Sequence, residues 1–326
     1  MNKKIGYGIA LAVLLAAPFY VYPLFLMKLL CFALFACAFN LLIGFTGLLS
    51  FGHAAFFGGA GYIAGWAIRD AGLPMELGIL LGVLAAALIG LVMGVLAIRR
   101  QGIYFTMITL ALAQMLYFVF LQAKFTGGED GLQGVPRAKL LGSLDLTSDL
   151  TLYYVVLAIA IAGFAVVVRA IHSPFGHVLK AVKENEPRAV SLGYDVDKYK
   201  LVAFVLSAAL AGLAGATKTL VLGFETLTDV HWTMSGLVVL MTLVGGLGTL
   251  VGPIVGAIII IALENKLGDF GNLLADWTTV DWFRNLGDSV TIVTGLIFIV
   301  CVLAFRKGIV GELSDRLQRV RKAKLS

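Results

Sequence analysis

The dominant feature of this sequence is a succession of long apolar segments that carry almost no charge. Hydrophobic residues make up 60% of the chain and charged residues 13%, whereas ordinary soluble domains have about 45–50% and about 25%. Several segments run for about 17 to 24 residues, the length that a helix needs to cross a hydrocarbon core about 30 Å thick. The sequence therefore predicts that a lipid bilayer is the solvent of this protein.

The backbone inside a bilayer decides the class of structure. Because no water is present there, every N–H and C=O group must be bonded within its own segment, which favours α-helices. We expect an all-α polytopic helix bundle that forms a single transmembrane domain over residues 1–326. Eight to ten spans are expected, and the ten candidates are 6–26, 29–45, 50–68, 77–98, 103–122, 151–171, 200–222, 234–249, 251–266 and 289–305.

Two candidate spans have unusual features. The first begins after a basic start, and Pro18 follows two alanines, a poor context for cleavage, so we expect an uncleaved span and not a signal peptide. The span at 50–68 holds five glycines, which leaves a continuous helix and a broken or re-entrant one as alternatives. The span junctions near 27 and 250 are the least sharply marked.

Lysine and arginine set the expected orientation, because they are enriched in cytoplasmic loops. With a cytoplasmic N-terminus, the ten-span arrangement places 17 of the 25 Lys and Arg residues inside and seven outside, and Lys218 falls within a span. Both termini, the loop 173–200 and the basic tail 306–326 are then cytoplasmic. Topology thus explains the net charge of +6, and no nucleic-acid partner is expected.

Motifs for catalysis, metal binding or nucleotide binding are missing from the sequence. The three cysteines lie in apolar spans without a CxxC pair, so they are expected to be buried apolar side chains. A lone histidine cannot form a metal site without Cys, Asp or Glu partners. No G-x-x-x-x-G-K-[ST] motif is present, and a helix-to-helix turn explains the glycine run at 245–253. We expect neither an enzyme nor a cofactor in this chain, so if the protein moves a molecule uphill, the energy must enter through another subunit.

Charged residues within the spans are few. Every Asp and Glu falls in a loop or at a span end, whereas carriers driven by protons or sodium commonly keep acids inside the membrane. The clear intramembrane ionisable residues are His53 and Lys218. We expect Lys218 either to extend its amine to the lipid headgroups or to lie near a substrate path. His53 is expected to be a hydrogen-bonded packing residue or a ligand.

Uncharged polar residues and glycine pairs complete the features of the spans. Polar side chains in otherwise apolar spans are expected to bond across helices or to line a substrate path; they are Asn40, Thr46, Ser50 and Gln114. Pairs of glycines four residues apart, at 61 and 65, 90 and 94, and 252 and 256, are expected to let helix backbones approach closely, with a moving hinge as the alternative. In the outside loop 123–150, Glu129 and Asp130 form either a contact for a soluble partner or a solvated acidic turn.

The loop 173–200 is organised more than a simple connection requires. Ser173 and Pro174 form a helix start, with Ser as N-cap, and Val178, Leu179 and Val182 share one face. Pro187 disfavours helix at the residue before it, so the first helix is expected to end near Asn185. Pro187 can then begin a very short helix that Gly193 ends and that presents small and charged side chains. The alternative is a solvated basic loop that only enforces topology.

The same loop resembles the EAA-type coupling segment of ATP-binding-cassette (ABC) importer permeases in its amino acid uptake version. The matching stretch is KENEPRAVSLGYDVDKYKLVAFVLSAALAGLAGA at 183–216. Four residues occupy motif positions, and with the neighbouring Glu184 they form the implied ATPase-coupling set: Glu184, Glu186, Arg188, Ala189 and Gly193. The resemblance implies that the short helix docks into a groove on an ATP-binding subunit.

The rest of the chain is similar to the branched-chain amino acid permease family, LivM type. The stretches that carry this resemblance are NLLIGFTGLLSFGHAAFFGGAGYIAG at 40–65, RQGIYFTMITLALAQ at 100–114, FTGGEDGLQGVP at 125–136 and GGLGTLVGPIVGA at 245–257. They imply a multi-pass subunit of a bacterial inner-membrane importer. Its expected partners are a second homologous permease subunit, two cytoplasmic ATPases that bind ATP and Mg, and a periplasmic substrate-binding protein that Glu129 and Asp130 would contact.

The function implied is passage of a branched-chain amino acid through an alternating-access pore. Within the same class, a permease for urea, other amides or a monosaccharide is the first alternative. The alternative from another class is an ion-coupled carrier or a channel that needs no ATPase.

Overall fold

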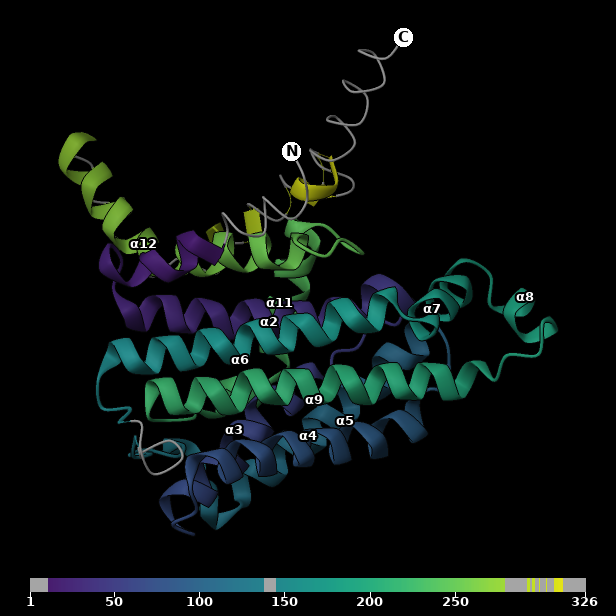
Figure 1. Cartoon of the computed structure of the whole chain (residues 1–326), viewed down its shortest axis with the longest axis horizontal. Coiled ribbons are helices and arrows are strands. Elements are labelled where there is room, and N and C mark those ends of the chain that lie inside the picture. The colour runs from purple at the N-terminus through teal and green to yellow at the C-terminus, as the bar shows by residue number, and fades with distance from the viewer. Residues whose placement is uncertain are drawn as a thin grey trace. The chain divides into compact units, whose positions relative to one another are not determined.

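The structure is a computed structural model that describes residues 11–137, 145–278, 292–293, 295–296, 299, 303 and 308–312, with the backbone alone for 267–278. It is built from helices, as expected, and the described residues contain no strand. The main helices are α2 (Pro23–Thr46), α3 (His53–Arg69), α4 (Met75–Ala97), α5 (Ile103–Gln122), α6 (Asp149–His172), α7 (Pro174–Glu184), α8 (Glu186–Ser191), α9 (Val196–Leu222), α10 (Leu227–Val230), α11 (Trp232–Gly245) and α12 (Gly252–Thr278), and Figure 1 labels most of them.

Five of the described helices are long and apolar enough to cross a membrane, namely α2, α4, α5, α6 and α9. They correspond to five of the predicted spans, and the shorter α3 and α11 correspond to two more. The predicted span 289–305 and the basic tail 306–326 lie largely outside the described residues, as do both termini. The all-α polytopic prediction is therefore confirmed, while the full number of spans stays a prediction.

One predicted junction is wrong. The break between the first two spans lies at Tyr20–Tyr22 and not near residue 27, and α2 starts at Pro23. Proline suits this first helical position because its missing N–H would have no partner there. Lys28 lies inside α2 with its amine 5.8 Å from the ring centroid of Phe32, one turn further on.

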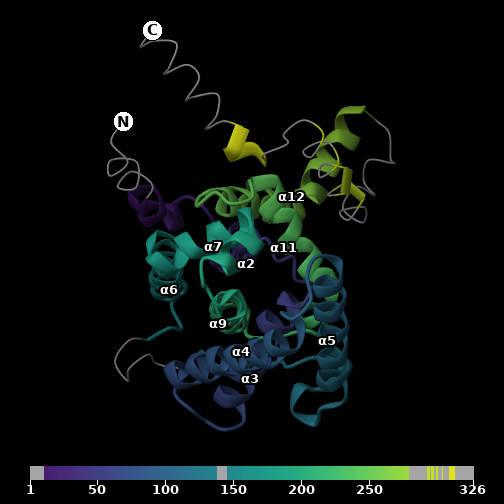
Figure 2. The same cartoon turned by 90° about the vertical axis from the view of Figure 1, so that its right-hand side faces the viewer.

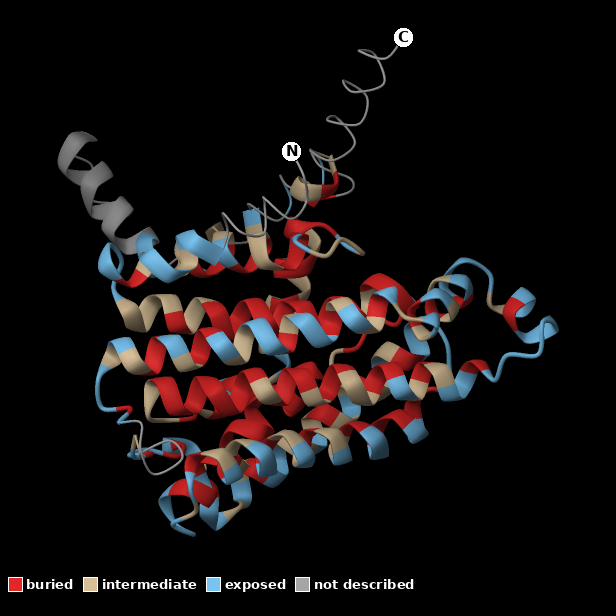
Figure 3. Cartoon of the chain, in the orientation of Figure 1, coloured by how far each residue is buried: buried red, intermediate tan, exposed pale blue. Residues whose placement is uncertain are grey.

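The chain divides into two compact units, Met1–Gly236 and Leu237–Ser326. Within the first, α9 is the central helix and packs against α2, α3 and α4, with α6 also in contact. Figure 2 looks along α9 and shows it between α2 above and α4 below. Figure 3 shows buried residues concentrated on α9, whereas α4 and α6 carry many exposed apolar side chains. This is the pattern of helices whose outer faces meet lipid.

Small residues set the distance between the central helices, as the glycine pairs predicted. A Cβ placed on Gly90 of α4 would lie 2.5 Å from the Cβ of Ala208 on α9. One placed on Gly94 would lie 2.7 Å from a methyl of Leu201. Any larger side chain at these positions would push α4 away from α9, so the glycines serve close packing.

The non-helical segment 47–52 joins α2 to α3 inside the bundle. Its backbone is bonded by hydroxyl side chains: the Phe51 N–H donates to Thr109 Oγ1 over 3.2 Å, and Thr106 donates to the carbonyl of Leu49 over 2.9 Å. Ser235 donates to the carbonyl of Phe51 over 2.8 Å. Irregular backbone at membrane depth is tolerated only when such partners exist. The predicted span 50–68 is thus a continuous helix, α3, preceded by this bonded segment.

In the second unit, α11 and α12 form a tight hairpin. α11 ends at Gly245 and α12 begins at Gly252, which confirms the predicted turn in the glycine run. A Cβ on Gly256 would clash with the carbonyl of Met241, and one on Gly245 with the carbonyl of Gly252. The backbones of the two helices therefore approach as closely as glycine permits.

The connections of the first unit gather at two opposite ends. At one end, α7 follows α6 and α8 projects beyond α9 (Figure 1), and Gln101 from the α4–α5 connection reaches Glu186. At the other end, Leu132 and Glu225 exchange two backbone hydrogen bonds of 2.9 and 2.8 Å. The guanidinium of Arg69 donates to the carbonyl of Gln133 at this same end. This grouping matches the predicted topology, while the end that faces the cytoplasm stays a prediction.

Candidate functional site

The α7–α8 pair, called the coupling unit below, has the local structure that its sequence predicts. Ser173 caps α7 by accepting the N–H of Gly176, and α7 ends at Glu184, next to the expected Asn185. Asn185 caps α8 by accepting the N–H of Arg188. Gly193 follows with a φ of 88°, a backbone conformation that glycine adopts without strain. The projecting short helix is therefore confirmed.

The coupling unit has a small apolar core of its own. Val182, Ala189 and Val196 are buried together, and the partly buried Val178 packs against them. The rings of Phe175 and Tyr199 stack with centroids 5.9 Å apart. These contacts join α7, α8 and the start of α9 into one body, because each of them contributes to the same core.

Lysines attach the coupling unit to the end of α2. The amine of Lys183 donates to the carbonyl of Gly44 over 2.7 Å, and the amine of Lys180 lies 5.6 Å from the ring centroid of Phe45. The last carbonyls of a helix lack partners within the helix and carry partial negative charge. A cation placed there therefore stabilises both the helix end and the attachment.

The predicted ATPase-coupling residues differ in where their side chains lie. Glu184, Arg188 and Gly193 are exposed, whereas Ala189 is buried in the core of the unit. The expectation of small and charged side chains on the surface is thus incomplete. Val190 is 56% exposed and Leu192 is 70% exposed, so the tip of α8 presents apolar side chains to the surroundings.

Glu186 is held by groups of its own chain. Its Oε1 accepts a bond of 2.6 Å from the amine of Lys200 and one of 2.9 Å from the amide of Gln101. The Lys200 side chain is only 3% exposed and the Glu186 side chain 25%. Three segments meet in this group, called the Glu186 clamp: α8, the start of α9 and the α4–α5 connection.

A second set of charged groups lies buried near the other end of α9. The amine of Lys218 is 2.5 Å from a carboxylate oxygen of Asp229 and 3.3 Å from one of Glu225. All three residues are at most 5% exposed. The expectation that Lys218 extends to the headgroups is wrong, because its partners lie inside the bundle. We call these three residues the buried charge cluster.

The buried charge cluster also corrects the expectation about acids. Glu225 and Asp229 follow a span in the sequence, but the chain folds inward after α9, and α10 packs against α3. Gly61 makes room, since a Cβ there would lie 2.7 Å from Glu225 Oε2. Thr219 donates to that same oxygen, while Glu225 Oε1 and the hydroxyl of Tyr62 have no hydrogen-bond partner in the described part of the chain.

His53 occupies a buried position between α3, α2 and α9. Its Nε2 lies 2.9 Å from Ser207 Oγ, and Ser207 donates its hydroxyl to the carbonyl of Ala38. Because that hydroxyl proton is used, Ser207 accepts the His53 bond and the histidine carries its proton on Nε2. Phe39, Phe56 and Phe204 surround the ring in edge-on contacts. The helix-packing alternative for His53 is therefore the one that the contacts favour.

The other predicted path residues are scattered. Thr46 donates to Leu42 of its own helix and Ser50 accepts the N–H of Gly52, so both bond locally and not across helices. Asn40 is buried on α2, and Gln114 is half-buried on α5. The bonds of Thr46 and Ser50 thus do not join them to the other residues predicted for the path. Glu129 and Asp130 are exposed at the end opposite the coupling unit.

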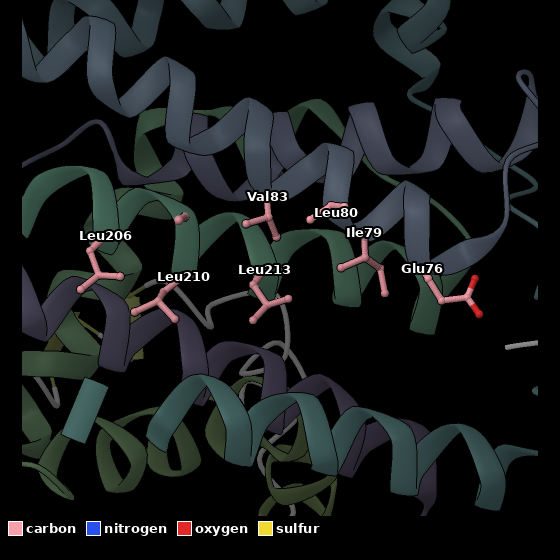
Figure 4. A pocket seen from close by; sticks show the side chains of 8 residues that line it. Glu76, Ile79, Leu80, Val83, Leu206, Leu210 and Leu213 are labelled. Atoms are coloured by element: carbon pink, nitrogen blue, oxygen red, sulfur yellow. The ribbon is translucent and has the colours of Figure 1, made fainter. Parts of the chain in front are cut away.

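An apolar groove of about 360 Å³ runs along the outer surface between α4 and α9. Figure 4 shows Ile79, Val83 and Leu210 among its lining side chains, with Glu76 at one end. Except for that carboxylate, the lining offers no group that could bind a charged or hydroxylated molecule. The groove therefore suits lipid chains or an apolar helix and not a polar substrate.

Sequence reasoning missed several of these residues. Lys200 and Gln101 look like loop residues until α8 folds back onto them, and the apolar tip of α8 is hidden in a stretch that seems charged. One signal was present for Asp229, because Thr226 and Asp229 have the spacing of a capping box, and the structure contains that box at the start of α10. Glu225 has no comparable local signal.

Comparisons with known proteins agree with this architecture. The LivM permease protein of a high-affinity branched-chain amino acid transport system of Escherichia coli K12 is 26% identical over 254 residues, which are 71% of this chain and 60% of LivM. The fructose import permease protein FruG of Bifidobacterium longum is 25% identical over 67% of this chain and 66% of FruG. The autoinducer 2 import system permease protein LsrC of Klebsiella pneumoniae is 29% identical over 57% of this chain and 53% of LsrC.

The matched region spans only 60% of the length of LivM. No solved structure matches the chain significantly. The named relatives are permeases of import or transport systems, and the apolar helices of this chain are those of a multi-pass membrane protein. A family model described as "Branched-chain amino acid transport system / permease component" matches residues 23–302, so the chain belongs to this family of transport permeases.

Proposed function

We propose that this chain is a membrane-spanning subunit of an ABC importer that carries branched-chain amino acids across the bacterial inner membrane by alternating access. A second homologous permease subunit, two cytoplasmic ATPases and a periplasmic binding protein complete the proposed assembly. ATP and Mg bind to the ATPases, and no cofactor is assigned to this chain. The observation that carries the proposal is the coupling unit, a rigid projection of the bundle that ends in exposed apolar side chains.

The tip of α8 is suited to docking in a groove. Leu192 and Val190 are exposed apolar side chains beside the exposed Arg188, and apolar anchors flanked by arginine are typical of protein interfaces. The core of the unit and its attachment to α2 fix the position of this tip relative to the bundle. A push on α8 is therefore transmitted to the membrane helices.

The buried charge cluster removes one argument against an ion-coupled carrier, since two carboxylates lie within the bundle after all. Both face Lys218, which supplies a fixed positive charge, whereas an ion path needs carboxylates that can exchange their cation. We assign the cluster, with Asn40 and Gln114, to the walls of the substrate path, and His53 to helix packing. Glu129 and Asp130 are proposed to contact the binding protein.

Uptake into cells tests the substrate. A strain that lacks this chain is complemented with the wild type and given radiolabelled leucine, fructose or urea. The proposal predicts uptake of leucine, with unlabelled isoleucine and valine as competitors. Restored uptake of fructose alone would favour a sugar permease, which the similarity to FruG makes the second candidate.

Purification tests the energy source. Tagged wild-type chain extracted from its native membrane is expected to co-elute with an ATPase. Arg188→Ala and Leu192→Asp are expected to lose that ATPase. Leucine uptake by vesicles that contain this chain and no ATPase would show an ion-coupled carrier or a channel and would refute the proposal.

A further inference from the structure

Glu186 occupies a motif position for ATPase coupling, but its carboxylate is turned toward its own chain. Oε1 accepts both the amine of Lys200 and the amide of Gln101. A carboxylate that is committed to two donors of the bundle is poorly placed to bind an external subunit. In contrast, Arg188 is exposed on the same short helix and Leu192 is exposed directly after it.

The link between Glu186 and Lys200 differs from an ordinary surface ion pair. Nearby, Lys198 and Asp195 form a pair of 2.7 Å whose side chains are 81% and 51% exposed, and such pairs contribute little. Lys200 is almost fully buried, so its ammonium loses most of its hydration and depends on Glu186. The pair therefore holds α8 against the first turns of α9.

Movement of α8 would affect the rest of the first unit mainly through α9. It packs against α2, α3 and α4 in the centre of the first unit, and its other end carries Lys218 in the buried charge cluster. If α8 moves and pulls Lys200 along the axis of α9, the whole helix shifts. The movement is then transmitted to the buried charge cluster, because α9 is continuous between the two lysines.

We propose that Glu186 is a positioning residue that ties α8 to α9 through Lys200, so that α9 moves with the coupling unit, and that it is not an ATPase contact. This inference rests on the proposed function. Docking belongs to the exposed tip of α8, and the Glu186 clamp converts docking into movement of the central helix.

The test uses the whole importer and variants that leave no buried charge unpaired. Glu186→Gln with Lys200→Met neutralises the clamp, and Glu186→Lys with Lys200→Glu reverses it. Asp195→Asn with Lys198→Met is the matched control, because it neutralises an exposed pair in the same region. For each variant, co-elution of the ATPase, ATP hydrolysis and leucine uptake by reconstituted vesicles are measured.

We expect the neutral clamp variant to retain the ATPase and its ATP hydrolysis. Its leucine uptake should fall about tenfold or more, because a typical coupling free energy between two sites changes an affinity by a factor of this size. The reversed pair should recover part of the uptake, and the control should resemble the wild type. Separation of hydrolysis from uptake is a result that a purely structural role would not give.

Two outcomes would overturn the inference while leaving the proposed function intact. One is normal uptake by the neutral clamp variant. The other is loss of the ATPase from both the neutral and the reversed clamp variant while the control retains it, since Glu186 would then be the contact itself. A wild-type chain that co-elutes with no ATPase would instead refute the proposed function, and the inference with it.

Discussion

Lys200 and Lys218 lie on the same face of α9, because their separation in the sequence equals about five turns of an α-helix, or about 27 Å. Each amine is buried and each is ion-paired with residues of another segment. Ser207 lies between them on that face and contacts His53. The central helix is therefore held by polar contacts at both ends and in the middle, along a face that is otherwise packed with small and apolar side chains.

The tip of α8 gives the first prediction. Leu192→Asp should leave the thermal stability of the isolated chain unchanged, because Leu192 is 70% exposed. Binding of the ATPase should weaken at least about tenfold, since burial of a leucine contributes about 1.5–3 kcal/mol and 1.4 kcal/mol is tenfold. Titration of the purified ATPase onto immobilised chain measures this, with Lys198→Ala as the exposed control. Unchanged affinity would exclude the tip from the interface.

Close packing of α4 on α9 gives the second. Gly90→Ala should lower the free energy of unfolding by about 1–3 kcal/mol, because the added methyl would lie 2.5 Å from the Cβ of Ala208. Adding Ala208→Gly should restore part of the loss. Gly236→Ala is the control, since nothing lies within 4 Å of its Cβ position. Thermal unfolding in detergent is the measurement, and equal midpoints for the two single variants would contradict the packing argument.

Ser207 gives the third. Ser207→Ala should cost about 1–3 kcal/mol of stability, because it leaves the buried His53 Nε2–H without an acceptor. Thr217→Val should lower the stability less, since the Thr217 hydroxyl only donates to the carbonyl of Leu213 in its own helix. The comparison uses the same unfolding assay. A Ser207 variant as stable as the wild type would mean that His53 finds another partner.

The sequence predicted local features well where the cause was local. The residues that bound the two helices of the coupling unit act through their own backbone; they are Ser173, Pro174, Pro187 and Gly193. The two helices could therefore be predicted from the sequence alone. The predicted start of the second span is wrong because the charged Lys28 interrupts the apolar pattern, whereas in the structure its amine simply lies over Phe32. Local signals thus succeed when the residue itself dictates the backbone.

The candidate site was less predictable, because its partners are far apart in the sequence. Gln101 and Glu186 meet only through the arrangement of α4, α5 and α8. Glu225 follows a span in the sequence and is therefore predicted to be a loop residue, and only the inward fold of the chain after α9 buries it beside Lys218. A hydropathy pattern records how apolar each segment is, but it does not record which polar groups face one another.

Lys218 gives the last prediction, which tests whether its amine is held inside the bundle or extends to the lipid headgroups. If its amine extended to the headgroups, Lys218→Met would be nearly neutral. Because the amine instead faces Asp229 and Glu225 inside the bundle, removing it leaves two buried carboxylates without their cation, and the free energy of unfolding should fall by about 3–5 kcal/mol.

Replacing all three residues of the buried charge cluster with uncharged ones, Lys218→Met with Glu225→Gln and Asp229→Asn, should recover most of that loss, since no buried charge then lacks a partner. Lys124→Met, at an exposed lysine, should change nothing. Thermal unfolding of the three variants beside the wild type decides the matter, and a triple variant less stable than Lys218→Met would show that the carboxylates do not depend on the lysine.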